Sequence, residues 1–521
     1  MSIMQMLLAS VSAAAAAVDS YFPYVTMLLH AEGTNGATNS TFIDGSTNNF
    51  SLTRNGNATQ GSFSPYGSNW SMYNNGTSGN LLSVANNTAL QLGSTYTAEA
   101  WVYALAYGGN LRVWTDGSTN VNNVDLYVTS GGVLGLSGGA ATVSGYTLPL
   151  NTWVHIAVVV NAGALSVYID GTSRTLSGTT TGYNSNATTT RYIGAYSSVG
   201  YEWNGYISNV RFTKGGALYT STFTPSTTPL TTTVSAGTVS LLMCQSNRFI
   251  DTSVNAFTVT IGGSPSIQRF CPFTFSTAYS TATNGGSMYF DGSGDNVQAG
   301  ASANLVLNGG AFTIEAWIYN TNASASNAEI VSQDNGSSTG QTFQFRIGTG
   351  LKLDFIYFTS SARSSAVTIT STGTIPTNAW THVAVSWGGA GTGVKIFING
   401  TLDTTSGNVA SMYAPASIAT AIGSQILASP AAGYFTGYIT DVRLIKGSQQ
   451  YTATFTPPTA PLTAITNTQL LVNSTNGGIV DNAMINDLET INTTLSSTQA
   501  KFGSTSMSFN GSSTYINFWC W

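Results

Sequence analysis

Short runs in which apolar and polar residues alternate dominate this chain. Clear examples are residues 153–160, 165–170 and 394–399. Alternation with a period of two is typical of a strand that packs one face against a core. The pairs Asp170-Gly171 and Asn399-Gly400 end two of these runs, and an Asx-Gly pair between such runs favours a tight hairpin. The pattern predicts an all-β chain of many short antiparallel strands.

The chain also repeats one set of short words in the same order. Thr-Ala-Glu-Ala-Trp-Val-Tyr at 97–103 returns as Thr-Ile-Glu-Ala-Trp-Ile-Tyr at 313–319. The words at 151–158, 205–215 and 223–225 return at 378–385, 437–447 and 455–457. The spacing between the copies is well over 200 residues, far longer than a solenoid or propeller repeat. Each copy is therefore expected to be a domain in its own right.

Many short strands with turns at this spacing, in units of about 200 residues, imply two-sheet sandwiches of jelly-roll type. We expect a first jelly roll at 19–234 and a second at 235–464, with a truncated third repeat at 465–521. Residues 1–18 are apolar but lack the positive charge of a secretory signal. Their strong helix formers predict a short N-terminal helix that attaches the chain to a partner, the alternative being a frayed terminus.

The third repeat is incomplete. Its opening word at 468–472 is followed by Ile-Val-Asp at 479–481 and Ser-Met-Ser-Phe-Asn-Gly at 506–511. The counterparts of the last two lie at 42–44 and 71–76 in the first copy, and at 249–251 and 287–292 in the second. A quarter of a unit cannot close a sandwich, and open strand edges invite pairing. Two interpretations stay open: these strands complete another subunit or a neighbouring protein, or they are a truncated copy packed on the second unit.

Each unit resembles the LamG-like jelly roll of the concanavalin A-like lectin/glucanase superfamily. The matching words lie at 312–317, 380–385, 396–401 and 438–443. The opening phrase at 27–36 and the closing phrase at 451–462 are also similar to those of tail, fibre and appendage proteins of tailed bacteriophages. The resemblance implies a jelly-roll fold and a place on a virion, and many relatives hold Ca²⁺ at the sandwich rim.

The amino-acid composition limits the classes of partner that this chain is expected to bind. Hydrophobic residues make up 42% of the chain and charged residues only 7%, against roughly 25% charged in an average domain. Aromatic residues at 11% are too frequent for a disordered chain, and no apolar run reaches the roughly 20 residues of a membrane span. A net charge of −5 with 15 scattered Lys and Arg residues argues against nucleic acid. We expect neither nucleic-acid binding nor membrane insertion.

The three cysteines, Cys244, Cys271 and Cys520, have no metal-ligand spacing and do not recur between the copies. A disulfide framework is therefore not expected, although a Cys244–Cys271 bridge is one alternative. Cys244 ends an apolar run at 239–244, where a free cysteine acts as a small apolar residue.

Three polar residues recur at matching positions: Glu99 and Glu315, His155 and His382, and Arg211 and Arg443. A glycosidase of this kind needs two carboxylates facing a cleft, and none of the six glutamates stands in the Glu-x-Asp-x-x-Glu strand that the resemblance associates with glucanases. A buried glutamate also survives only with partners. We therefore expect the recurrent glutamates to be structural and paired with the arginines, and the histidines to be satisfied by a neighbour.

A calcium site is better supported by the sequence than a catalytic site. Asp291, Asp295 and Asn296 offer three side-chain oxygens within one Gly-rich loop, as a hard cation requires. The first copy has Asn74 and Asn80 at the corresponding loop and no carboxylate. The alternative is a plain Gly-rich turn.

Carbohydrate binding would use exposed aromatic rings in loops, for which the candidates are Trp70, Tyr183, Tyr201, Trp203, Tyr413 and Tyr434. Trp203 aligns with Phe435 just before a strand, so packing is its alternative role. The tryptophans that alternate with polar residues are interpreted as core: Trp101, Trp153, Trp317, Trp380 and Trp387.

Together these features predict a non-enzymatic virion protein, a tail, fibre or head appendage that displays jelly rolls for attachment to a host. The alternatives are a receptor-binding lectin for a host glycan and, disfavoured, a polysaccharide hydrolase. Attachment to other virion proteins is expected through 1–18 and 466–521. Self-association is expected as well, with a trimer by analogy to phage appendages.

Overall fold

The computed structural model describes most of the two repeats and parts of the third. The described residues are 70–116, 125–136, 140–186, 188–196, 201–245, 284–307, 309–334, 341–415, 418–426 and 433–474, with short pieces at 29–31, 52–55, 59–61, 247, 253–256, 259–262, 266–268, 479–481, 487–491, 494–496, 498, 506–509, 511 and 515–519. The N-terminal helix expected at 1–18 lies outside them, and so do Cys271 and Cys520.

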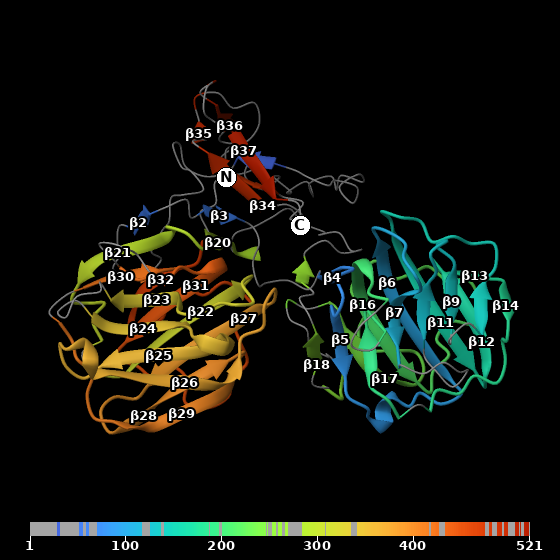
Figure 1. Cartoon of the computed structure of the whole chain (residues 1–521), viewed down its shortest axis with the longest axis horizontal. Coiled ribbons are helices and arrows are strands. Elements are labelled where there is room, and N and C mark those ends of the chain that lie inside the picture. Colours follow the sequence, from blue (N-terminus) through green and yellow to red (C-terminus); the bar gives the residue numbers. More distant parts are fainter. Residues whose placement is uncertain are drawn as a thin grey trace, which may run out of the picture.

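The first repeat forms a sandwich of two antiparallel sheets (Figure 1). One, the β6 sheet, consists in order of β13 (Thr172–Arg174), β12 (Ala164–Ile169), β11 (Trp153–Asn161), β6 (Tyr96–Ala104), β16 (Asn204–Lys214), β4 (Ser71–Asn75) and β19 (Ser266–Gln268), with β17 (Thr238–Met243) also paired to β16. The other, the β7 sheet, consists of β14 (Leu176–Gly178), β10 (Ala141–Val143), β9 (Leu134–Leu136), β8 (Leu126–Val128), β7 (Leu111–Thr115), β15 (Arg191–Ile193), β5 (Leu81–Val84) and β18 (Val259–Gly262).

The second repeat forms the same two-sheet sandwich. Its β22 sheet consists in order of β29 (Thr401–Val409), β28 (Thr392–Ile398), β27 (Trp380–Trp387), β22 (Phe312–Asn320), β31 (Thr436–Lys446), β20 (Ser287–Asp291) and β3 (Thr59–Gly61), with β32 (Thr468–Val472) paired to β31. Its β23 sheet consists of β2 (Leu52–Asn55), β21 (Asn296–Ser302), β30 (Ile418–Ile422), β23 (Ala328–Asp334), β24 (Gln341–Ile347), β25 (Lys352–Phe358) and β26 (Ala366–Thr374). The all-β jelly-roll fold is confirmed.

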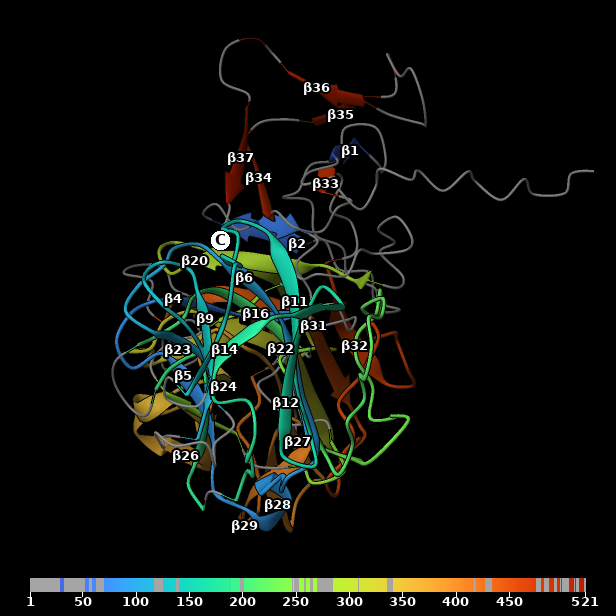
Figure 2. The same cartoon turned by 90° about the vertical axis from the view of Figure 1, so that its right-hand side faces the viewer.

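The remaining described elements are small. The strands are β1 (Leu29–Ala31), which pairs with β33 (Ile479–Asp481), and four strands of the third repeat: β34 (Asp487–Ile491), β35 (Thr494–Ser496), β36 (Ser506–Ser508) and β37 (Tyr515–Trp519). Three 3-10 turns occur at Thr88–Leu90, Thr349–Leu351 and Arg363–Ser365. Figures 1 and 2 both place β35 and β36 apart from the two sandwiches. Over the described part of the chain, no helix combines the length and the apolarity of a membrane span.

The two predicted Asx-Gly hairpins are confirmed. Asp170 and Gly171 have φ values of 48° and 74° and join β12 to β13. Asn399 and Gly400, with φ values of 49° and 76°, join β28 to β29 in the same way. A side chain at Gly171 would bring a Cβ to 1.8 Å from the carbonyl oxygen of Phe223. Glycine is therefore required there both for the backbone angle and for the close approach of the Phe-Thr-Pro word.

Burial separates the two faces of each sheet. Along β6, Ala98, Ala100 and Val102 lie in the core between the sheets, whereas Glu99 and Trp101 point to the outer face. The interpretation of Trp101 and Trp153 as core is wrong, because they alternate with the core residues of their strands and lie half-buried on the outer face. Trp317 and Trp380 also lie on the outer face of their sheet, but both are buried in the hydrophobic cluster that contains the core of the first unit, so their interpretation as core is confirmed. Trp387 does lie in the core of the second unit.

Two strand pairings cross the predicted domain boundaries, which themselves stay predictions. β17 was placed in the second jelly roll by the boundary at 234/235, but it pairs with β16 of the first unit. β32 in the same way pairs with β31 of the second unit, although the boundary at 464/465 assigns it to the third repeat. The opening words of the second and third repeats therefore each add a strand to a sheet of the preceding unit, which sequence repetition alone does not reveal.

Candidate functional site

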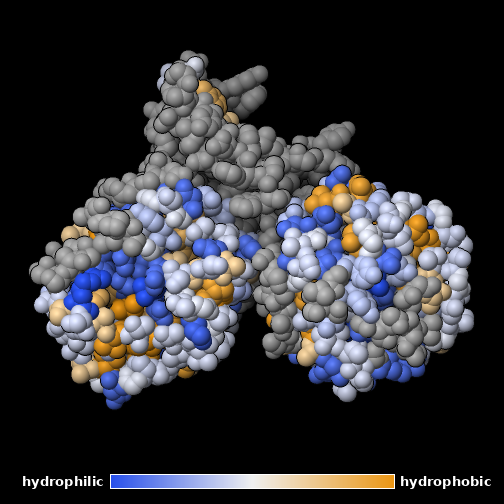
Figure 3. Space-filling view, in the orientation of Figure 1, coloured by the Kyte–Doolittle hydropathy of each residue, from blue (hydrophilic) through white to orange (hydrophobic). Residues whose placement is uncertain are grey.

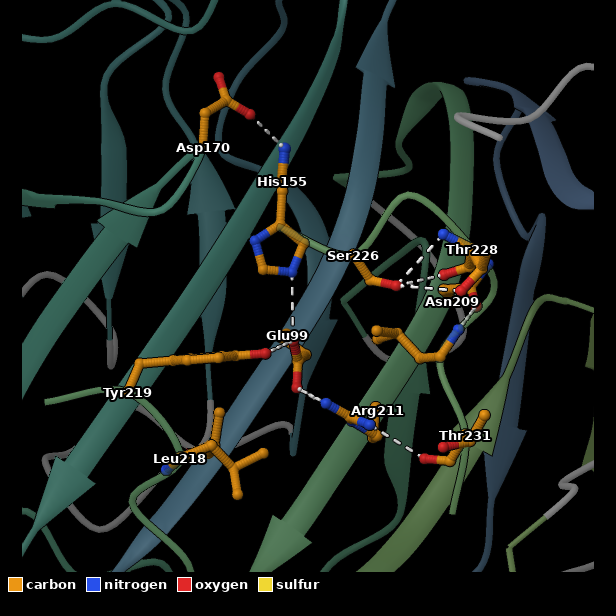
Figure 4. Close-up of polar contacts among 12 residues, drawn as sticks. Glu99, His155, Asp170, Asn209, Arg211, Leu218, Tyr219, Ser226, Thr228 and Thr231 are labelled. Atoms are coloured by element: carbon orange, nitrogen blue, oxygen red, sulfur yellow. Dashed lines mark hydrogen bonds and ion pairs between the residues drawn. The ribbon is translucent and has the colours of Figure 1, made fainter. Parts of the chain in front are cut away.

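A buried polar network lies on the outer face of the β6 sheet (Figure 4). Glu99 Oε1 accepts hydrogen bonds from Nε and Nη2 of Arg211 at 3.0 and 2.7 Å. Glu99 Oε2 contacts His155 Nε2 at 3.1 Å and accepts a hydrogen bond from the Tyr219 hydroxyl at 2.8 Å. Tyr219 in turn stacks on Phe223, with ring centroids 3.6 Å apart. The carboxylate is fully buried and engaged on both oxygens.

A β-bulge brings the arginine to the glutamate. The register of β16 against β6 shifts between Ser208 and Arg211, so that Arg211 becomes the direct partner of Glu99. Asn209 occupies the bulge with φ 54°, and its Oδ1 accepts a hydrogen bond from the backbone N–H of Leu230 at 2.7 Å. Asn tolerates this left-handed conformation better than most residues. The word Gly-Tyr-Ile-Ser-Asn-Val-Arg thus encodes a bulged strand.

The second unit repeats the network. Glu315 Oε1 accepts from Nε and Nη2 of Arg443 at 2.8 and 2.6 Å. Glu315 Oε2 contacts His382 Nε2 at 3.2 Å and accepts from the Tyr451 hydroxyl at 2.7 Å. The predicted pairing of the recurrent glutamates with the arginines is confirmed. Each histidine has the expected neighbour at Nε2, whereas its Nδ1 is buried without a hydrogen-bond partner among the described residues. Tyr219 and Tyr451 complete the networks, and sequence reasoning missed them.

Electrostatics keep these glutamates ionised. Burial alone would raise the pKa of Glu99, but the hydrogen bond from His155 and the charge of Arg211 together lower it below its ordinary value. The pKa of Glu315 is lowered for the same reasons through His382 and Arg443. Both oxygens of each carboxylate are hydrogen-bonded and buried, so the networks stabilise the sheet.

A different polar cluster lies on the β7 sheet of the first unit. The guanidinium carbon of Arg112 lies 4.4 Å from the ring centroid of Tyr127, 5.1 Å from that of Tyr196 and 5.6 Å from that of Tyr201. Arg112 Nε is 3.1 Å from the buried carboxylate of Asp125, and Nη1 donates to the carbonyl oxygen of Asn110 at 2.8 Å. We call Arg112 and the three tyrosines the arginine–tyrosine cluster.

Tyr201 is the open part of this cluster. Its side chain is 47% exposed, whereas Arg112 and Tyr127 are buried. Its backbone has φ 62°, and its carbonyl oxygen accepts a hydrogen bond from the Arg112 N–H at 2.9 Å. A bulky residue in the left-handed region costs of order 1–3 kcal/mol, and such strain gathers at binding sites. The result is an exposed aromatic ring fixed beside a cation.

In the second unit, Glu329 occupies the position that Arg112 has in the first unit. The N–H of Glu329 donates to the carbonyl oxygen of Gly433 at 2.8 Å, as that of Arg112 does to Tyr201. Arg346 faces Glu329 across the strands, as Tyr127 faces Arg112. Glu329 is fully buried, and among the described residues no hydrogen-bond donor reaches its Oε2. Arg346 Nη1 lies 3.8 Å from its Oε1. The scaffold is shared, but a carboxyl replaces the cation.

Burial dominates the charge state of Glu329. Desolvation raises its pKa well above the ordinary value, and the nearby charge of Arg346 offsets this only in part. The neighbouring side chains are polar: Gln344 hydrogen-bonds both Asp334 and Arg346, and Arg363 forms a bidentate pair with Asp334 at 2.7 and 2.9 Å. Figure 3 shows a hydrophilic patch, with a hydrophobic patch directly beside it, on the face of the second unit that carries β23, β24 and β25 in Figure 1.

The sequence as a whole matches one family model. A model described as the concanavalin A-like lectin/glucanases superfamily matches residues 74–218 and again 290–450, more than half of the chain. The chain belongs to this superfamily. Its two matched segments coincide with the two sandwiches, so this superfamily member contains the fold twice. No curated protein matches the chain.

Solved structures similar to this superfamily member are distant. A putative carbohydrate binding protein from Bacteroides ovatus is 15% identical with a TM-score of 0.27; the match covers 37% of this chain and 59% of that one. Domains LG4-5 of the mouse laminin alpha1 chain are 10% identical with a TM-score of 0.23, covering 77% and 96%. A heptameric SAP-like pentraxin from Limulus polyphemus is 16% identical with a TM-score of 0.23, covering 28% and 76%.

The predicted calcium ligands lie in the turn from β20 to β21. Asp295 Oδ2 accepts a hydrogen bond from the N–H of Asp291 at 3.0 Å, and Asp291 Oδ1 accepts from the N–H of Ser293 at 2.7 Å. Asn296 Oδ1 accepts from Gln298. The side-chain oxygens of the predicted calcium ligands thus accept hydrogen bonds from within or beside this turn. Within the described ranges no three His, Cys, Asp or Glu side chains gather as metal ligands. Calcium binding at this turn stays a prediction.

The aromatic candidates divide by burial. Trp70, Tyr183 and Trp203 are buried in the first unit and present no ring face to a sugar. Tyr413 and Tyr434 are half-buried, and Tyr201 is exposed. Sequence reasoning missed Arg112, Tyr127, Tyr196, Glu329 and Arg346, because these residues do not recur between the copies and lie in separate strands and loops. Cys244 is buried and free among the described residues. Cys271, its alternative bridge partner, lies outside them.

Proposed function

We propose that the chain is a non-enzymatic carbohydrate-binding protein that attaches a bacteriophage particle to the surface of its host. The observation that carries the binding role is the arginine–tyrosine cluster, in which Tyr201 is 47% exposed and held beside Arg112. An exposed ring supplies a stacking face for a sugar, and a cation next to it suits an acidic or hydroxyl-rich saccharide. The lectin-like jelly-roll fold supports the same role.

The non-enzymatic role is supported by the state of the recurrent carboxylates. Glu99 and Glu315 are fully buried and hydrogen-bonded on both oxygens, whereas glycoside hydrolysis needs two carboxylates that flank the substrate. The place on a virion rests on the resemblance of the opening and closing phrases to phage appendages. Peptides of this chain are expected in the mass spectrum of purified particles of the phage that encodes it, and their absence would contradict that place.

The binding role is tested with the full chain on a glycan array and on host-envelope polysaccharide. We expect saturable binding that one free sugar displaces, without release of reducing ends. Tyr201→Ala is expected to lower the affinity at least tenfold. Phe509→Ala, which removes a ring that is 53% exposed outside the cluster, is the matched control and is expected to bind normally. Release of reducing ends would favour a hydrolase, and equal binding by both variants would remove the cluster from the site.

A further inference from the structure

Three pairs of consecutive short strands, here called edge hairpins because of their chain path, pair with the edges of other strands; the two strands of each pair enter different sheets and do not form a ladder with each other. They are β2–β3, β18–β19 and β34–β35. β18 extends the β7 sheet beyond β5, and β19 extends the β6 sheet beyond β4. β2 and β3 extend the β23 and β22 sheets beyond β21 and β20 in the same way. The β18–β19 hairpin and the β2–β3 hairpin therefore each add one strand to each of the two sheets of a sandwich.

The edge hairpins bind their acceptor strands in one common register. Thr260 pairs with Ser83 in the first unit, and Thr53 pairs with Gln298 at the corresponding place in the second. The Ser-Met words in the acceptors also pair alike: Met72 faces Ile267, Met288 faces Gln60 and Met507 faces Leu495. The three acceptor edges are thus equivalent in backbone geometry.

The donors, by contrast, reach these edges from different places in the chain. The first unit receives the hairpin of the repeat that follows it, β18–β19. The second unit receives β2–β3 from the start of the chain, far upstream of it. In the third repeat, β34–β35 pairs with β37 and β36 of the same repeat. One backbone register is therefore reached through three different chain paths.

We propose that the β20–β21 edge also accepts the β2–β3 hairpin of a second copy of this chain, so that the protein associates with itself by hairpin exchange. The strands that follow β2–β3 in its own repeat, β4 and β5, are already occupied by β18–β19. The hairpin therefore has to leave its own repeat in any case, and the same hairpin from another copy forms the same ladder. An edge left without a donor is a pairing template. This proposal concerns assembly and stands apart from carbohydrate binding.

Paired cysteines test the exchange in the full chain. Cys271→Ser and Cys520→Ser remove two native thiols, and Cys244 stays, because burial raises the pKa of its thiol to about 12. One chain carries Thr53→Cys, another carries Gln298→Cys, and their mixture is treated with a short bismaleimide. We expect a covalent dimer of the two chains whose yield rises with protein concentration. The matched control, Thr260→Cys with Ser83→Cys on one chain, has the same register and is expected to crosslink within that chain.

Two results would overturn the proposal. The first is a mixture that stays monomeric at every concentration while a chain with both Thr53→Cys and Gln298→Cys crosslinks only within itself. The second is the absence of either product while the control pair reacts. Thr53→Pro gives an independent check, because proline removes a ladder donor from β2 without touching the acceptor edge. Light scattering is expected to show concentration-dependent association of the wild-type chain and its loss in this variant; persistence of association would contradict the exchange.

Discussion

Replacing Glu99 with glutamine removes the negative charge of the first buried network and keeps the size of the side chain. Arg211 is left as a buried cation without its carboxylate partner, since its remaining hydrogen bond goes from Nη1 to the carbonyl oxygen of Thr231 at 2.9 Å. Breaking a buried pair by removing one partner costs about 3–5 kcal/mol. We expect Glu99→Gln to lower the free energy of unfolding of the first unit by that amount, and Glu315→Gln to do the same in the second.

Denaturant titration followed by tryptophan fluorescence, with calorimetry to separate the two units, measures this loss. Asp291→Asn, at an exposed carboxylate in a turn, is the control and is expected to cost far less. The reasoning also fixes a pH dependence. Because the pKa of Glu99 is lowered in the folded chain, its contribution is present above the ordinary glutamate pKa of about 4.3 and disappears as pH falls through the lowered value.

The gap between wild type and Glu99→Gln is therefore expected to close in acid. A loss of less than about 1 kcal/mol at neutral pH, the range of an exposed ion pair, would refute the description of this network as a buried pair. A gap that stays constant from neutral to acidic pH would refute the electrostatic part of the argument and leave only packing.

Three further predictions follow from other parts of the chain. Glu329→Gln is expected to gain stability relative to the wild type as pH rises above the ordinary glutamate pKa of about 4.3, because burial raises the pKa of Glu329 and the wild type loses stability as pH rises from the ordinary to the raised value. Thermal midpoints against pH measure this, and parallel curves for the two proteins would contradict it. Gly171→Ala is expected to cost about 1–3 kcal/mol more than Gly93→Ala, which has the same φ of 74° but open space around it, so equal unfolding midpoints would rule out the contact with Phe223. Tyr201→Gly is expected to preserve or raise stability, because glycine adopts the left-handed backbone of this position without strain. The same variant is expected to lose glycan binding. A retained affinity on the glycan array would contradict a role of the Tyr201 ring in binding.

Features that depend on local chemistry could be predicted from the sequence. The turns at Asp170-Gly171 and Asn399-Gly400 need a left-handed backbone, which few residue types adopt, so the letters alone identify them. Repetition served the same purpose for the Glu99 network, because a glutamate and an arginine that return together point to a pair.

Features that depend on register could not be predicted. The bulge at Asn209 and the pairing of β17 with the preceding unit are set by contacts between distant strands. A run of alternating residues does not specify which distant strand it pairs with. The arginine–tyrosine cluster is similar, since Arg112, Tyr127 and Tyr201 come from two strands and a loop. Because these residues occur in only one copy, repetition gave no signal for them either.

The scarcity of charge has a consequence for the medium in which this protein can work. Only 7% of its residues are charged, and several of its ion pairs are buried: Glu99–Arg211, Arg112–Asp125, Asp116–Arg191 and Glu315–Arg443. Mobile ions screen exposed charges but hardly reach buried ones. The free energy of unfolding is therefore expected to depend little on ionic strength, from fresh water to brine.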